Sequence, residues 1–145
     1  MENVAAAHNR IIYCQKALEY LKVNSIKYSL EMYNVYWDSI LKNMKLNDGV
    51  IEVLSFLKER GIRIGICTDL TTNIQHRKIR QLGIEEYIDY IVTSEEAGEE
   101  KPGEKMFNLI LNKLKVNSNQ AVYVGDNFNK DVIGSFNVGM VSVWY

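Results

Sequence analysis

The sequence predicts an α/β protein with a Rossmann-like, three-layer α/β/α core around a parallel sheet, preceded by a helical segment. Two observations carry this prediction. After residue 50, short apolar stretches of strand length alternate with amphipathic stretches of helical period. Before it, apolar residues recur only at helical spacing. Strands that are separated by helices are joined by right-handed crossovers and therefore lie parallel in one sheet.

Two helices are predicted in the first third of the chain. One apolar stripe at helical spacing runs from Ile11 to Leu21, and a second runs from Tyr33 to Met44. Asn24-Ser25 separates the two stripes, and an Asn-Asp-Gly turn follows the second. We therefore divide the chain into a helical part, residues 1–46, and an α/β part, residues 47–145.

The α/β part alternates between helices and strands along its length. Gly61 and Gly83 are placed to end two of the helices, because glycine accepts the left-handed backbone of a C-cap. Short β-branched and aromatic runs predict the strands. The predicted helices begin at Val50 and span residues 73–81, 104–115 and 130–137, and the predicted strands span residues 62–67, 90–93, 121–124 and 140–144.

The composition is that of a globular domain of ordinary size. The 145 residues carry 17 basic and 18 acidic side chains, a formal charge of −1, so no bulk field favours nucleic acid or an anionic membrane. No apolar run is long enough to span a bilayer. Two cysteines, Cys14 and Cys67, are too few for a disulfide scaffold, and we predict reduced thiols and a cytoplasmic location.

The candidate functional residues follow the predicted strands, because ligands bind beyond the carboxyl ends of the strands in such sheets. Thr68 and Asp69 open a hydroxyl-rich stretch before a helix, where hydroxyls and backbone N–H groups can hold a phosphoryl oxygen. An ordinary N-cap explains the same stretch. Lys101 follows the second strand and is fixed by Pro102, so its ammonium can neutralise a phosphate or a carboxylate. The glutamates between residues 95 and 100 are interpreted as a solvated acidic loop.

A pair of acids follows the third predicted strand. Gly125 lets the backbone turn sharply, and Asp126 leaves the strand tip, where a carboxylate can ligate a hard cation. Asp131 is either a second ligand or a residue that favours the dipole of the next helix.

Taken in order, these stretches resemble three motifs of the haloacid dehalogenase-like (HAD) hydrolase superfamily. The motifs are a strand that ends in Thr68, a Lys-Pro at Lys101 before a helix, and Gly125-Asp126-Asn127 followed by Asp131. The resemblance is strongest to the branch in which a helical cap is inserted between the first and second motifs. It covers nearly the whole chain and assigns residues 1–46 to that cap and residues 47–145 to the core.

The resemblance implies a phosphatase that acts on a small phosphorylated metabolite through an aspartyl-phosphate intermediate. Thr68 and the backbone near Asp69 would bind the phosphoryl group, and Lys101 would hold the phosphate and the nucleophile together. Asp126 and Asp131 would bind Mg²⁺. A non-catalytic binding protein and a haloacid dehalogenase stay open as alternatives, as do nucleotide, sugar and phosphoglycolate monoesters as substrates.

The sequence departs from the superfamily in one respect. No Asp-x-Asp is present, and Asp38 lies within a helical pattern without a strand before it, so we reject it as the nucleophile. The strand that carries this motif in the family is the central one, between the first and third strands of this chain. We therefore expect an inactive fragment, or a chain whose missing strand is supplied by another chain. Open strand edges also predict self-association.

Overall fold

The helical first third is a hairpin in the structure, a computed structural model that describes residues 9–145. Helices α2 (Arg10–Tyr20) and α3 (Ser25–Asn43) pack against each other. Asn9 and Asn24 cap them, since their side chains accept hydrogen bonds from the backbone N–H groups of Ile11 and Lys27. The predicted break at Asn24-Ser25 is therefore the N-cap of the second helix.

The rest of the chain alternates between helices and strands, as predicted. Gly61 and Gly83 both have positive φ, at 68° and 65°, and follow helices as expected. The elements are α4 (Val50–Glu59), β1 (Gly65–Thr68), α5 (Thr72–Leu82), the 3₁₀-helix η1 (Glu85–Tyr87), β2 (Tyr90–Thr93), α6 (Ser94–Ala97), α7 (Glu104–Leu114), the 3₁₀-helix η2 (Ser118–Gln120), β3 (Val122–Gly125), the π-helix η3 (Phe128–Ile133), α8 (Gly134–Asn137) and β4 (Val141–Trp144).

The strands form two parallel pairs instead of one continuous sheet. β1 pairs with β2 from Gly65 opposite Tyr90, and β3 pairs with β4 from Val122 opposite Val141. Within the described residues, β1 and β3 do not pair. The Tyr123 hydroxyl of β3 nevertheless donates to the Cys67 carbonyl of β1, with an O···O distance of 3.0 Å. The two pairs therefore lie near each other, with one side-chain hydrogen bond where a strand ladder would run.

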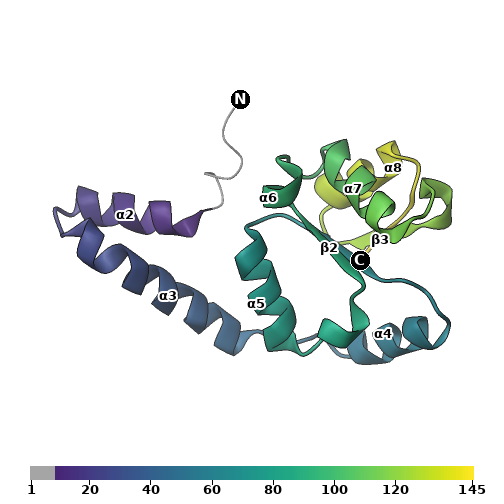
Figure 1. Cartoon of the computed structure of the whole chain (residues 1–145), viewed down its shortest axis with the longest axis horizontal. Helices are drawn as coiled ribbons and strands as arrows, with labels where there is room; N and C mark the ends of the chain where they lie inside the picture. The colour runs from purple at the N-terminus through teal and green to yellow at the C-terminus, as the bar shows by residue number, and fades with distance from the viewer. Residues whose placement is uncertain (1–8) are drawn as a thin grey trace.

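Helices lie on both sides of the strands, which confirms the three-layer α/β fold. In Figure 1, α7 and α8 lie above the strands, α4 and α5 lie below them, and the α2–α3 hairpin extends to one side. The buried core is centred on α7 and the first strand pair. It consists of Cys67, Val92, Met106, Phe107, Ile110, Leu111 and Met140.

The two strand pairs differ in burial. Val92 of β2 is fully buried, and Cys67 of β1 is 8% exposed. In the second pair, by contrast, Val122 and Val124 are each 62% exposed. One face of the second pair is therefore not covered by the rest of the described chain.

Several predicted boundaries differ from the structure. β1 begins at Gly65 and not at residue 62, because the backbone N–H of Ile64 is bound by the Asp89 carboxylate before the ladder starts. The helix predicted over residues 130–137 begins earlier, at Phe128, and its first part is a π-helix. The Asn127 side chain starts this turn by accepting from the Lys130 N–H.

Two further sequence predictions concern the cysteines and membrane-spanning segments. Cys14 and Cys67 are both free and buried. Within residues 9–145, no helix has the length and apolar character that crossing a membrane requires.

Candidate active site

The predicted site residues come from loops beyond the carboxyl ends of three strands. Thr68 and Asp69 follow β1, Lys101 follows β2 and α6, and Asp126 follows β3. Asp131 lies within η3, the helix that β3 leads into. The arrangement draws on both strand pairs.

Hydrogen bonds join three of these residues. Asp69 Oδ1 accepts from the backbone N–H of Lys101, with an N···O distance of 3.2 Å. The Lys101 ammonium in turn lies 2.5 Å from Asp131 Oδ1. Asp69, Lys101 and Asp131 are thus brought into one network, with Thr68 next to it in the chain, whereas the Asp126 side chain is exposed and stands outside it.

Hydrogen bonds from neighbouring segments hold the loop after β1 in place. The Thr68 hydroxyl accepts from the buried Gln75 amide at 2.9 Å, so the first turn of α5 positions it. Leu70 has a φ of +87°, a conformation that costs a non-glycine residue energy. Its N–H donates to Ser94 Oγ at 3.0 Å, which links this turn to the end of β2.

Lys101 is held in a largely buried position. Its side chain is 12% exposed, and its ammonium donates to Asp131 and, at 3.2 Å, to the Tyr123 hydroxyl. The ammonium also lies 5.8 Å from the centre of the Tyr123 ring. A lysine fixed in this way holds its positive charge at a defined position.

Asp131 is buried and remains a carboxylate. Burial raises its pKa, but the hydrogen bonds from the Lys101 ammonium and the Asn127 N–H outweigh burial and hold the pKa below its ordinary value. Gly125 makes room for this side chain, since a Cβ there would overlap the Asp131 carboxyl. The φ of Gly125 is not positive, so the close approach of Asp131, and not a left-handed backbone, explains the glycine at this position.

Lys130 is part of the network but was not predicted from the sequence. Its ammonium lies 2.9 Å from Asp69 Oδ2 and 3.1 Å from Glu100 Oε2. The hydrogen bond that the Lys130 ammonium donates to Asp69 is the main reason that the pKa of Lys130 is raised above its ordinary value. The residue stands inside the motif that contains Asp126 and Asp131, but only the folded chain places it beside the other two loops.

Two neutral groups lie beneath the charged ones. Burial raises the pKa of the Cys67 thiol to about 12, and burial likewise raises the pKa of the Tyr123 hydroxyl. Both groups are therefore uncharged at neutral pH, and Tyr123 acts as a hydrogen-bonding group between β1, Lys101 and Asp131.

The donor set fits a magnesium ion that retains most of its water. Mg²⁺ is commonly bound by one or two carboxylates together with water and substrate phosphate. Asp126 makes no side-chain hydrogen bond within residues 9–145, and Asp131 Oδ2 accepts from only one donor, the Asn127 N–H. Among the described residues no group of three or more His, Cys, Asp or Glu side chains is placed to hold a metal. Asp126 and Asp131 are thus the two carboxylates that could bind the ion.

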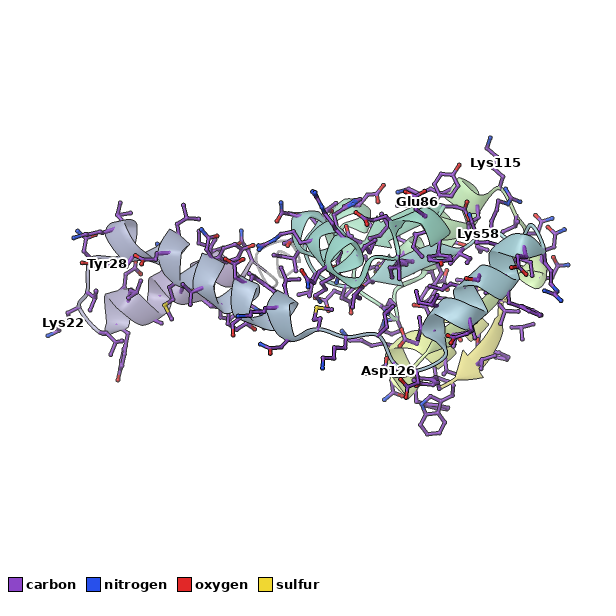
Figure 2. All side chains as sticks on the ribbon, turned by 90° about the horizontal axis from the view of Figure 1, so that it is seen from below. Lys22, Tyr28, Lys58, Glu86, Lys115 and Asp126 are labelled. Atoms are coloured by element: carbon purple, nitrogen blue, oxygen red, sulfur yellow. The ribbon has the colours of Figure 1, made fainter. Side chains whose placement is uncertain are left out.

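Figure 2 shows that Asp126 lies far from Lys22, which is at the tip of the helical hairpin.

The interpretation of residues 95–100 as a solvated acidic loop is wrong in part, because Ser94–Ala97 form α6, although Glu95 and Glu96 are exposed. Glu95 accepts from the Thr72 N–H at the start of α5, and the other three glutamates each pair with a lysine. The carboxylates are therefore bound by lysine ammonium groups and by a backbone N–H that has no acceptor within its own helix. The lysine partners are Lys113 for Glu96, Lys105 for Glu99 and Lys130 for Glu100.

Comparisons with known proteins agree with this fold and with the family resemblance. The family described as haloacid dehalogenase-like hydrolase matches residues 8–145. The chain is 40% identical over 143 residues to ribulose-1,5-bisphosphate 5-phosphatase of Halopiger xanaduensis, a match over 97% of this chain and 59% of the relative. It is 37% identical over 97 residues to glyceraldehyde 3-phosphate phosphatase of Pyrococcus abyssi, over 67% of this chain and 41% of the relative. The chain therefore spans less than two thirds of the length of either relative.

Solved structures share the fold at lower identity. A 2-haloacid dehalogenase from Pseudomonas syringae superposes on 94% of this chain and 57% of its own length, with a TM-score of 0.76 and 24% identity. A HAD phosphatase from Thermococcus onnurineus superposes on 93% of this chain and 76% of its own, with a TM-score of 0.68 and 22% identity.

Proposed function

We propose that this chain, which belongs to the haloacid dehalogenase-like hydrolase family, forms the phosphate-binding and metal-binding part of a magnesium-dependent phosphatase for small phosphomonoesters. One observation carries the proposal: the Asp69–Lys101–Asp131 network joins the loops beyond both strand pairs. A phosphoryl group at this edge would meet a fixed ammonium, a hydroxyl and carboxylates suited to a hard cation.

The residues of the chain have distinct roles in this proposal. The Thr68 hydroxyl and the backbone at Asp69 bind phosphoryl oxygens, and the Asp69 side chain serves to orient the Lys101 backbone. The Lys101 ammonium neutralises charge on the transferred phosphoryl group, which a largely buried cation does more strongly than an exposed one.

Asp126 and Asp131 would hold Mg²⁺, Asp131 either directly or through water. The bound ion supplies a positive charge that stabilises the phosphoryl oxygens in the transition state. Asp131 is suited to this role, because its pKa is held below the ordinary value and it is ionised at neutral pH.

The nucleophile in this proposal is an aspartate outside these 145 residues. It would lie on a strand between β1 and β3, where the described strands do not pair and Tyr123 reaches across to Cys67. The same chain or another chain would supply this strand, and attack on the phosphate would give an aspartyl phosphate that water then hydrolyses. The 145-residue chain by itself would be inactive.

A small phosphosugar is the substrate class that we favour. The two similar phosphatases are named for ribulose-1,5-bisphosphate and glyceraldehyde 3-phosphate, both small sugar phosphates. Residues 1–46 would act as the cap over the leaving group, although residues 1–8 lie outside the described part. We propose a cytoplasmic location for the whole enzyme.

A non-catalytic binding protein is the second candidate. It needs no nucleophile, because the Asp69–Lys101–Asp131 network is formed by residues of this chain alone. Such a protein would bind a phosphorylated ligand at the same loops and release it unchanged.

Hydrolysis of an aryl phosphate in the presence of Mg²⁺ tests the proposal. The 145-residue chain is compared with the same chain joined upstream to a strand that ends in Asp-x-Asp. We expect the extended chain to be active, the short chain to be inert, and Asp126→Asn in the extended chain to lower the rate at least about tenfold. Asp48→Asn is the matched control, since Asp48 is another exposed aspartate in a turn.

Three results would contradict the proposal. Turnover by the short chain that depends on Asp126 would show that the nucleophile is already present. Equal activity of the Asp126 and Asp48 variants would remove the metal role. An extended chain that binds phosphate without any turnover would favour the binding protein.

A further inference from the structure

Lys130 connects the loops that follow three different strands. The residue itself follows β3, its partner Asp69 follows β1, and its partner Glu100 follows β2 and α6. The Lys130 side chain is 39% exposed, and the side chains of Asp69 and Glu100 are 18% and 28% exposed. The two ion pairs are thus partly shielded from water, so they are screened less than pairs on an open surface.

The contacts of Lys130 close a circuit around the candidate site. Asp69 accepts from Lys130 through one carboxylate oxygen and from the Lys101 backbone N–H through the other. The Lys101 ammonium reaches Asp131, which directly follows Lys130 in η3. A shift of the Lys130 ammonium would therefore move Asp69 and, through Asp69, the segment that carries Lys101.

The charge of Lys130 matters as much as its position. Asp69 and Glu100 are two carboxylates close to the loop that would receive a phosphoryl group, and uncompensated negative charge there would repel it. The paired ammonium offsets this repulsion without facing the phosphate itself.

We propose that Lys130 is a positioning residue: it fixes the Asp69 carboxylate against the Lys101 backbone and so sets the affinity of the site for phosphate. The inference rests on the proposed function, because it assigns the phosphate to the Thr68–Lys101 side of the network. Lys130 acts through Asp69 and is not itself a phosphate ligand.

The test is a Lys130→Gln substitution in the 145-residue chain, with two measurements. The hydrogen-exchange rate of the Lys101 amide reports the hydrogen bond that this N–H donates to Asp69. The exchange rate of the Val92 amide, in a fully buried residue, reports global unfolding. Titration with inorganic phosphate gives a dissociation constant. We expect Lys101 exchange to accelerate, and phosphate to bind more weakly, each by about threefold to tenfold, with Val92 exchange unchanged.

Two further variants separate positioning from general stability. Lys58→Gln removes an ion pair of similar exposure, 34%, to Asp89, and Figure 2 shows Lys58 on α4 apart from Asp126. It is expected to leave both the Lys101 exchange and the phosphate affinity unchanged. Lys130→Arg keeps the charge and is expected to restore most of the wild-type values.

Either of two outcomes overturns the inference. One is a Lys101 amide exchange rate that is unchanged in Lys130→Gln. The other is a Lys58→Gln variant that accelerates this exchange as much as Lys130→Gln does. Should Lys130→Gln fail to fold, Glu100→Gln removes one partner and leaves the pair with Asp69, so Lys101 exchange should rise less than threefold. If wild-type protein binds no phosphate, the proposed function fails, while Lys101 exchange still decides the role of Lys130.

Discussion

The two strand pairs have the same topology but opposite surroundings. Each consists of two parallel strands of four residues, joined through helices. The first pair is covered by α7 and contributes Cys67 and Val92 to the core, whereas the second exposes Val122 and Val124. The same strand pairing therefore occurs with very different degrees of burial. The packed pair lies within the core, and the second pair reaches the core through Tyr123 and through Ala121 and Met140, which directly precede its two strands.

The largest effect should come from the packed side. Phe107 is fully buried and meets the Tyr123 ring edge-on at a centroid distance of 5.1 Å. Phe107→Ala should lower the free energy of unfolding by about 3–5 kcal/mol, because it removes a buried ring and leaves a cavity. Phe136→Ala, at a 68% exposed position, should cost less than about 1 kcal/mol. Urea unfolding measures both, and equal losses would contradict the difference in packing.

The next effect concerns the hydrogen bond between the pairs. Tyr123→Phe keeps the ring but removes the hydroxyl that donates to the Cys67 carbonyl and accepts from Lys101. We expect a loss of about 1–2 kcal/mol in the free energy of unfolding. Tyr90→Phe is the control, since the Tyr90 side chain is 41% exposed. No difference between the two variants would mean that Tyr123 does not connect the strand pairs.

A smaller effect should appear in acid at the amino end of the packed pair. The Lys58 ammonium, followed by the Ile64 N–H, holds the pKa of Asp89 below its ordinary value. A lowered folded pKa contributes stability that is present above the unfolded pKa, about 3.9, and is lost as pH falls through the folded value. Asp89→Asn should therefore lower the Tm more at pH 6 than at pH 2. An equal Tm change at both values would contradict this assignment.

The smallest effect should come from the exposed pair. Val124→Thr places a hydroxyl on a side chain that is 62% exposed and should change the free energy of unfolding by less than about 0.5 kcal/mol. Val92→Thr places the same group in the core and should cost about 1–3 kcal/mol. A large loss at Val124 would indicate that another strand or a second copy covers this face in solution.

The sequence predicted the order of the elements better than the contacts between them. Periodicity and glycine C-caps located the longer helices, and β-branched and aromatic runs located the four strands, because these signals are local. The short helix α6 was not predicted. The fixation of Lys101 by Asp131 and Tyr123 joins residues far apart in the chain, so no local signal reports it. The same applies to Lys130. The close approach of Asp131 to Gly125 could not be predicted either, since a close approach and a turn favour the same residue type.

A titration of the ¹⁵N-labelled chain with inorganic phosphate and Mg²⁺, monitored through the backbone amide shifts, shows whether the two strand pairs share one phosphate site. We expect the largest shifts at Thr68–Leu70, Lys101 and Asn127, which means that loops beyond both strand pairs respond together. A rival location is the groove between α3 and α5, which is lined in part by Lys42, Arg77 and Arg80. Shifts confined to that groove, or to the loops of only one strand pair, would contradict a shared phosphate site.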